Sequence, residues 1–198
     1  MTLDKPFQPE EVLMNCCIGI VDIVGSCQIV TRLRKDMVFP FYRTFLDEMS
    51  YIIRKSNGIP VKNIGDCVLY YFPQASETSK REAFVDSMEC GMKMIAARDT
   101  VNSKLGQCGL PPVSYRISSD YGLVTLTKRG DFTEDVFGPT VNICSRLNKM
   151  AKPNNMVIGG DLHQVVKSFE EYKFSIASEY QNGLKLQYPV YSISRHSV

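Results

Sequence analysis

The sequence lacks the features that mark zinc-binding and disulfide-framed proteins. It has only two histidines, His163 and His196, which are far apart and too few for a metal cluster. Its seven cysteines are an odd number, and no two of them have the C-x-x-C spacing. We therefore expect free, mostly buried thiols in a reducing compartment, and neither a disulfide framework nor a zinc site.

No charge of either sign dominates the chain. Lys and Arg total 23 against 21 Asp and Glu, and a net charge of +2 argues against a nucleic-acid partner held by bulk charge. The longest apolar run, residues 12–24, is short for a membrane span and contains Asp22. Residues 1–10 lack the basic and apolar regions of a signal peptide. We therefore expect a cytoplasmic chain without a membrane segment.

The composition is that of an ordinary globular protein. The 198 residues are 44% hydrophobic and 22% charged, which suits one domain with a sizeable core. We see no internal repeat, low-complexity tract or interdomain linker. The expected organisation is an N-terminal extension over residues 1–11 followed by one domain over residues 12–198.

Hydrophobic periodicity predicts the elements of the first half. A strand buried on both sides is expected over 12–24, ended by Gly25 and Ser26. Helical spacing follows over 28–55, where Pro40 indicates two helices or a kink. Two strands, 59–64 and 67–72, are joined by a Gly-Asp turn, and a long helix is expected over 76–105.

The second half is richer in strands. Strands are expected at 113–117, 123–127 and 135–137, then a helix at 139–151, a strand at 156–158, a short helix at 162–166, and strands at 172–177 and 186–193. Helices and strands do not alternate strictly. The order predicts an α+β sandwich with a ferredoxin-like βααββαβ pattern, a mixed or antiparallel sheet and a β-rich C-terminal extension.

Two carboxylates stand at the ends of predicted strands. Asp22 interrupts an apolar strand, where a charge is costly unless paired or metal-bound, although the last residue before a turn can also lie at the surface. Asp66 occupies a tight turn, which favours Asp for local reasons. If the first strand lies beside this hairpin, both carboxylates reach one end of the sheet and form an oxygen-ligand site suited to Mg²⁺ or Mn²⁺.

An amide and a guanidinium share a stripe of the helix expected at 139–151. Asn142 and Arg146 are four residues apart, so they project from neighbouring turns. Such a pair suits an oxyanion or a phosphate. The simpler interpretation is a solvated surface stripe.

Four stretches follow one another in the sequence: Val21-Asp22-Ile23-Val24-Gly25-Ser26; Lys62-Asn63-Ile64-Gly65-Asp66; Asp135-Val136-Phe137-Gly138-Pro139-Thr140-Val141-Asn142 with Ser145-Arg146-Leu147; and Gly183-Leu184-Lys185 to Pro189-Val190-Tyr191. In this order they make the chain resemble the catalytic domain of class III nucleotidyl cyclases, the adenylate and guanylate cyclase family. The resemblance runs from about residue 12 to residue 193.

This resemblance implies conversion of a nucleoside triphosphate to a 3′,5′-cyclic nucleotide and pyrophosphate. It implies that Asp22, Asp66 and the Ile23 carbonyl hold two Mg²⁺ or Mn²⁺ ions per site. One ion would lower the pKa of the ribose 3′-OH, and the other would bind the triphosphate. Backbone N–H groups of residues 24–27, Gly25 and Ser26 among them, would cradle phosphate oxygens.

The resemblance also implies how the base is chosen. Lys62 and Asp135 match the base-selecting positions, where Lys donates to adenine N1 and Asp accepts from the exocyclic amine. Guanine reverses both polarities, and guanylate-type members carry Glu- and Cys-like residues there. The chain is therefore expected to select ATP.

Four further residues receive roles through the same resemblance. Asn142 would orient the ribose, and Arg146 would meet charge developing on the α-phosphate. Lys185 and Arg129 are candidate triphosphate-binding cations. The metal-binding residues of one subunit would face the base-selecting, amide and guanidinium residues of the other, so we expect a homodimer with two composite sites.

Departures from the family pattern leave other functions open. Ser118-Ser119-Asp120 stands where Gly-Ile-His is usual, Ser26 replaces an aromatic, and Pro139 replaces Asp or Asn. One alternative is a weakly active, cyclase-like nucleotide-binding or dimerisation module, and another is a cyclase for a different nucleoside triphosphate. A third is an unrelated nucleotidyl-transfer palm, which gives no role to Asn142 with Arg146.

Overall fold

The computed structural model describes residues 10–76, 80–130, 132–181 and 187–196. Its strands are β1 (Glu10–Ile23), β2 (Ile59–Ile64), β3 (Cys67–Phe72), β4 (Tyr115–Arg129), β5 (Phe132–Phe137), β6 (Asn155–Gly159), β7 (Tyr172–Gln181) and β8 (Gln187–Arg195). Its helices are α1 (Ser26–Val30), α2 (Lys35–Lys55), α3 (Arg81–Ala96), α4 (Arg98–Gln107), α5 (Pro139–Asn148) and α6 (Gly160–Val166). Within these ranges no helix combines the length and apolarity needed to cross a bilayer.

The strands form one mixed sheet. Its order is β2-β3-β1-β4-β6-β8-β7, and β5 pairs with β4 off this path. β4 and β6 run parallel, whereas the other pairs of described strands are antiparallel. The predicted α+β fold with a mixed sheet and a β-rich end is confirmed.

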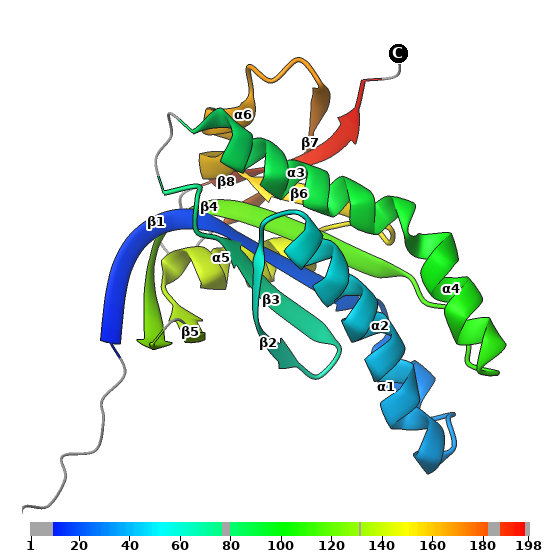
Figure 1. Cartoon of the computed structure of the whole chain (residues 1–198). Helices are drawn as coiled ribbons and strands as arrows, with labels where there is room; N and C mark the ends of the chain where they lie inside the picture. The colour runs from blue at the N-terminus through cyan, green and yellow to red at the C-terminus, as the bar shows by residue number, and fades with distance from the viewer. Residues whose placement is uncertain (1–9, 77–79, 131, 182–186, 197–198) are drawn as a thin grey trace, which may run out of the picture.

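Helices cover the two faces of the sheet unequally. Figure 1 shows α2, α3 and α4 together on one side of the strands and α5 behind them. The first face buries Val21, Tyr70 and Phe72 against α2 residues such as Phe41 and Phe45. On the second face, α5 supplies Cys144 and Leu147 to two smaller clusters. The end of the second face beside β2 and β3 is therefore left for a cleft, described below.

The breaks in the helices differ from those expected. Helix α2 continues through Pro40, and the interruption lies at residues 31–34, between α1 and α2. Pro40 is tolerated because it stands in the second turn, where its missing N–H leaves only the carbonyl of the exposed Asp36 without its helical partner. The single helix expected over 76–105 is divided at Ala97 into α3 and α4.

The two strands expected at 113–117 and 123–127 are one continuous strand, β4. The residues between the two expected strands, Gly122 among them, lie inside β4. A Cβ at Gly122 would come within 2.6 Å of the Thr140 hydroxyl on α5. The glycine therefore allows α5 to approach the sheet and does not end the strand.

A buried carboxylate occupies the position where the sequence departs from the family pattern. Asp120 on β4 is 1% exposed. Its Oδ1 accepts backbone N–H groups from Tyr121 at 2.9 Å and Leu162 at 3.2 Å, and its Oδ2 accepts the Tyr188 hydroxyl at 2.8 Å. Burial raises the pKa of Asp120 to about 6, although these three hydrogen bonds oppose the shift. The residue thus ties β4 to α6 and β8.

We expect an Asp120→Asn variant to gain stability relative to the wild type as the pH rises. The pKa of Asp120 is raised in the folded state, so the folded protein favours the protonated form, and ionisation removes stability between about pH 4 and pH 6. The difference in unfolding free energy between Asp120→Asn and the wild type should change by on the order of 2–3 kcal/mol between pH 4 and pH 7. Urea denaturation at four pH values measures it. A difference that stays constant contradicts the assignment, and the exposed Asp47→Asn should change stability by less than about 0.5 kcal/mol throughout.

Candidate active site

The two candidate metal-binding carboxylates lie at the same end of the sheet. β1 and β3 are antiparallel neighbours, and their register places Asp22 opposite Cys67. Asp66 directly precedes Cys67, in a turn where Gly65 has a φ of +64°. Burial and the neighbouring negative charge of Asp66 raise the pKa of Asp22 to about 6. We call Asp22 and Asp66 the acidic corner.

Two cations flank the acidic corner, and the sequence analysis identified neither. Arg116 on β4 lies directly opposite Asp22 in the β1–β4 register, and its charge lowers the pKa of Asp22. Lys149, next to the end of α5, has the same effect more weakly. The Arg116 Nε is buried without a hydrogen-bond partner among the described residues. A buried donor without a partner is costly, so this nitrogen is an unsatisfied group beside the acidic corner.

The donor set fits a hard divalent cation that keeps open coordination positions. In the described ranges no three His, Cys, Asp or Glu side chains gather as a ligand cluster. The acidic corner therefore offers two carboxylates and no third such side chain. Mg²⁺ is usually bound by one or two carboxylates together with water and substrate phosphates, which is the arrangement these residues allow.

The loop that follows Asp22 turns directly into α1. Gly25 adopts a left-handed conformation with a φ of +69°, and α1 begins at the buried Ser26. The N–H groups of Ser26 and Cys27 belong to the first turn of α1, where helical N–H groups have no acceptor within the helix. The expected phosphate cradle is wrong in one respect: the Val24 N–H donates to the Ser114 carbonyl at 2.8 Å. The Val24 N–H is therefore already hydrogen-bonded within the chain, and the candidates for a phosphate are the N–H groups of residues 25–27.

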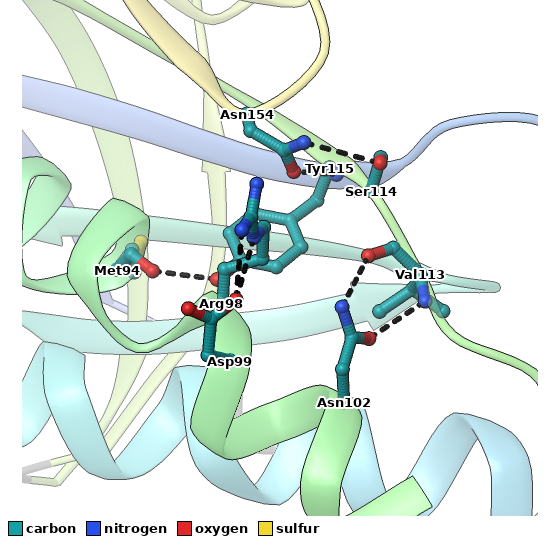
Figure 2. A network of polar contacts seen from close by, with 8 residues as sticks. All are labelled: Met94, Arg98, Asp99, Asn102, Val113, Ser114, Tyr115 and Asn154. Atoms are coloured by element: carbon teal, nitrogen blue, oxygen red, sulfur yellow. Dashed lines mark hydrogen bonds and ion pairs between the residues drawn. The ribbon is translucent and has the colours of Figure 1, made fainter. Parts of the chain in front are cut away.

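An asparagine clamps the segment that precedes β4. Asn102 on α4 donates through Nδ2 to the Val113 carbonyl at 3.1 Å, and its Oδ1 accepts the Val113 N–H at 2.7 Å. The Tyr115 hydroxyl donates to the Met94 carbonyl at 2.6 Å. Figure 2 shows these contacts converging on one segment from the α3–α4 junction. Both helices beside the break at Ala97 therefore contact the chain where it enters β4.

A second asparagine fixes the same segment from the other side. Asn154, before β6, accepts the Tyr115 N–H through Oδ1 at 3.3 Å and donates through Nδ2 to the Ser114 hydroxyl at 3.1 Å (Figure 2). Ser114 is the residue that binds Val24. Two side chains remote in sequence thus hold the backbone on which the loop after Asp22 rests.

The two base-selecting candidates, 73 positions apart in the sequence, are in contact. The Lys62 Nζ donates to the Asp135 Oδ2 at 2.6 Å, which joins β2 to β5. The Asp135 Oδ1 accepts the Val136 N–H at 2.7 Å, so the carboxylate is held in one orientation. The Lys62 ammonium also lies 5.8 Å from the centre of the Phe137 ring. We call Lys62 and Asp135 the reading pair.

Asn142 and Arg146 are both exposed on successive turns of α5. Asn142 lines a cleft of about 370 Å³ between α5 and the end of the β1–β3 pair, together with Asp22, Cys67 and Lys149. The amide of Asn142 and the carboxylate of Asp22 therefore border the same cleft of one chain. Arg146 lies one turn further along α5 and is not among the residues that line this cleft.

Three further candidates are Arg129, Lys185 and the Ile23 carbonyl. Arg129 is exposed at the end of β4, opposite Phe132 on the hairpin that carries Asp135. Lys185 lies outside the described residues. The Ile23 carbonyl belongs to the last residue of β1, beside Asp22. The roles of all three remain predictions.

Comparison with known proteins identifies the family of the chain. The family model "Adenylate and Guanylate cyclase catalytic domain" matches residues 9–193. A cytidylate cyclase of Staphylococcus aureus is 24% identical over 178 residues, covering 86% of this chain and 42% of that protein. An adenylate cyclase of Streptomyces coelicolor is 26% identical over 150 residues, covering 75% of this chain and 33% of that protein. The chain therefore spans less than half the length of either relative.

The fold is shared with a solved cyclase structure. The adenylyl cyclase CyaB from P. aeruginosa superimposes with a TM-score of 0.81 at 20% identity, over 96% of this chain and 99% of that one. At this identity the likeness concerns the fold alone. The family match spans almost all of the sequence. The chain therefore belongs to the family of adenylate and guanylate cyclase catalytic domains.

Proposed function

We propose that the chain is an adenylate cyclase domain, which converts ATP to 3′,5′-cyclic AMP and pyrophosphate at a site shared by two copies of the chain. The observation that carries this proposal is the acidic corner: Asp22 and Asp66 meet at one end of the sheet, beside Arg116. Two close carboxylates with a flanking cation suit a site that receives divalent metal and triphosphate together.

The metal chemistry follows from the family. Class III cyclases use Mg²⁺ or Mn²⁺, and in this chain Asp22, Asp66 and the Ile23 carbonyl would hold two such ions. When bound, the ions supply acidification of the ribose 3′-OH and neutralisation of the triphosphate. Asp22 must lose its proton to serve as a ligand, and its pKa of about 6 makes this form available at neutral pH.

The chain's own donors would bind the phosphates and the ribose. The N–H groups of Gly25, Ser26 and Cys27 belong to the turn between β1 and α1, where they would donate to a phosphate oxygen. Arg116 would place its positive charge beside the same group. Asn142 would orient the ribose, and Arg146 would stabilise charge developing on the α-phosphate. Arg129 and Lys185 remain candidates for the outer phosphates.

The choice of ATP rests on the reading pair. One relative is named an adenylate cyclase and another a cytidylate cyclase, so membership of the family does not set the base. Lys62 can donate to adenine N1 while Asp135 accepts from its amine, and the 2.6 Å contact holds both groups side by side. Both side chains are partly exposed, so they can meet a ligand.

A second copy of the chain has an apolar surface on which to pack. Two large apolar side chains close to the reading pair are exposed: Ile64 at 58%, on the strand of Lys62, and Phe137 at 51%, whose ring faces the Lys62 ammonium. Ile64 also borders the cleft with Asp22. Exposed apolar groups gathered beside a functional site favour a protein partner there. We therefore propose a homodimer with composite sites.

The direct test is to incubate the purified chain with ATP and Mn²⁺ and to identify the product by mass spectrometry. We expect cyclic AMP and pyrophosphate in equal amounts, and no product when EDTA is added. Absence of cyclic AMP with both Mn²⁺ and Mg²⁺ would refute the proposal. ATP binding without product would instead support a nucleotide-binding module.

A further inference from the structure

We infer that the reading pair recognises bases that carry an amino group as a class, so that CTP is a second substrate beside ATP. This inference rests on the proposed function and extends it from one nucleotide to a chemical class. It follows from the contact between Lys62 and Asp135 and from the hydrogen-bonding edges of the four bases.

The reading pair presents one donor beside one acceptor. The Lys62 ammonium has three N–H groups and uses one of them on the Asp135 Oδ2, 2.6 Å away. The Asp135 Oδ1 is occupied by the Val136 N–H, which fixes the plane of the carboxylate. The Oδ2 keeps a lone pair for a second donor. A ligand therefore meets an ammonium donor and a carboxylate acceptor at adjacent points and in a fixed order.

Adenine and cytosine offer the complementary edge in the same order. Each has an exocyclic amine donor next to a ring nitrogen acceptor: N6 and N1 in adenine, N4 and N3 in cytosine. Guanine and uracil carry a carbonyl oxygen next to a ring N–H. The ring N–H would then face the Lys62 ammonium, donor against donor, and the carbonyl would face the Asp135 carboxylate, acceptor against acceptor. The order of donor and acceptor therefore separates amino bases from keto bases, and it does not separate a purine from a pyrimidine.

The exposure of the reading pair allows Lys62 to adjust to the smaller ring of a pyrimidine. The Lys62 side chain is 37% exposed and that of Asp135 is 23% exposed, so neither is locked inside a closed pocket. Lys62 reaches the site on a flexible four-carbon stem. A cytosine edge lies nearer to its ribose than an adenine edge does, and this stem can move toward it. We expect CTP to be used less well than ATP because Asp135 is fixed and cannot follow to the same extent.

The experiment compares all four nucleoside triphosphates with the intact chain and Mn²⁺. UTP is the matched control for CTP, because its ring has the same size and the opposite edge. We expect kcat/KM to be at least about 10-fold higher for CTP than for UTP, since a well-formed pair of hydrogen bonds discriminates between bases by roughly 10- to 100-fold. Equal rates for CTP and UTP, with ATP turned over, would overturn the inference and leave the proposed function intact.

A binding measurement separates the two proposals. The 3′-deoxy forms of CTP and UTP lack the hydroxyl that reacts, so calorimetry reports recognition alone. We expect the CTP analogue to bind at least about 10-fold more tightly than the UTP analogue. If no nucleotide is cyclised, the proposed function fails, and the binding ratio still decides the inference: a ratio near one overturns it.

Two variants test whether the preference for CTP over UTP depends on the reading pair. Asp135→Asn replaces the acceptor by a group that can donate or accept, so the CTP:UTP ratio should fall toward one. Asn63→Ala lies on the same strand outside the pair and should leave the ratio unchanged. A ratio that survives Asp135→Asn would contradict recognition by this carboxylate.

Discussion

Replacing Asp66 by Ala will lower the rate of cyclic-nucleotide formation by at least about 1,000-fold, which corresponds to about 4 kcal/mol of transition-state stabilisation. The reason is electrostatic. Asp22 and Asp66 together balance the positive charges of Arg116 and Lys149, whereas Asp22 alone leaves this corner with a net positive charge. Such a corner no longer attracts a divalent ion, and the metal contribution to catalysis is lost.

The Asp66→Ala variant should still fold, which makes the loss interpretable. Asp66 lies in a partly exposed turn, and its removal takes away a negative neighbour of Asp22 without creating a cavity. Thermal unfolding should therefore move by no more than a few degrees. The matched control is Asp47→Ala on the exposed face of α2, which should keep the wild-type rate. An Asp66→Ala variant with unchanged turnover would remove the acidic corner from the mechanism.

The second large effect is a change of base preference. The double substitution Lys62→Glu with Asp135→Cys should move the ratio of ATP to GTP turnover toward GTP by about 100- to 10,000-fold, because a site built to hydrogen-bond one edge rejects the other strongly. Glu accepts from the guanine ring N–H, and the small thiol no longer repels the guanine carbonyl. The measurement is kcat/KM for both nucleotides with the same metal.

The single variants serve as controls for this swap. Each leaves one half of the reading pair without its 2.6 Å partner, so each should lower turnover of ATP without creating preference for GTP. The contact joins β2 to β5, and circular dichroism of the single variants checks that this junction persists. A double variant that still prefers ATP by the wild-type ratio would show that the base is read elsewhere.

Much of the fold was predictable because its elements carry strong periodic patterns. The apolar run that became β1 and the hairpin β2–β3 lie within two residues of the expected bounds. The hydrophobic pattern of residues 76–105 did not predict the division of the long helix at Ala97, after which α4 carries Asn102 to Val113. The continuity of β4 through Gly122 was not predicted, because the glycine provides close packing against Thr140, a contact between residues of different elements.

The site residues that belong to sequence motifs were predicted. Those that reach the site only through the pairing of two strands were not. Spacing alone gives no reason to join Lys62 to Asp135, and only the resemblance to cyclases paired them. Arg116 went unnoticed because its place beside Asp22 depends on the antiparallel register of β1 and β4. The Val24 N–H was assigned to phosphate because the competing carbonyl of Ser114 is 90 residues away.

One feature of the site separates two accounts of catalysis. Asn142 and Asp22 border the same cleft of a single chain, which is the arrangement that a complete site within one chain requires. We propose instead that Asn142 and Arg146 act on the acidic corner of a second copy. Arg146 is exposed on α5 and is not among the residues lining the intrachain cleft, as a group directed at a neighbour would be. The central claim is therefore that the site is shared.

Mixing two inactive variants tests this claim most directly. Asp66→Ala and Arg146→Ala should each be inactive alone. In an equal mixture, half of the dimers contain both variants, and each of these has one site with no defect, so activity should return to about a quarter of the wild-type value. A mixture that stays inactive, although dimers are shown to exchange subunits, would contradict the shared site and place the whole reaction within one chain.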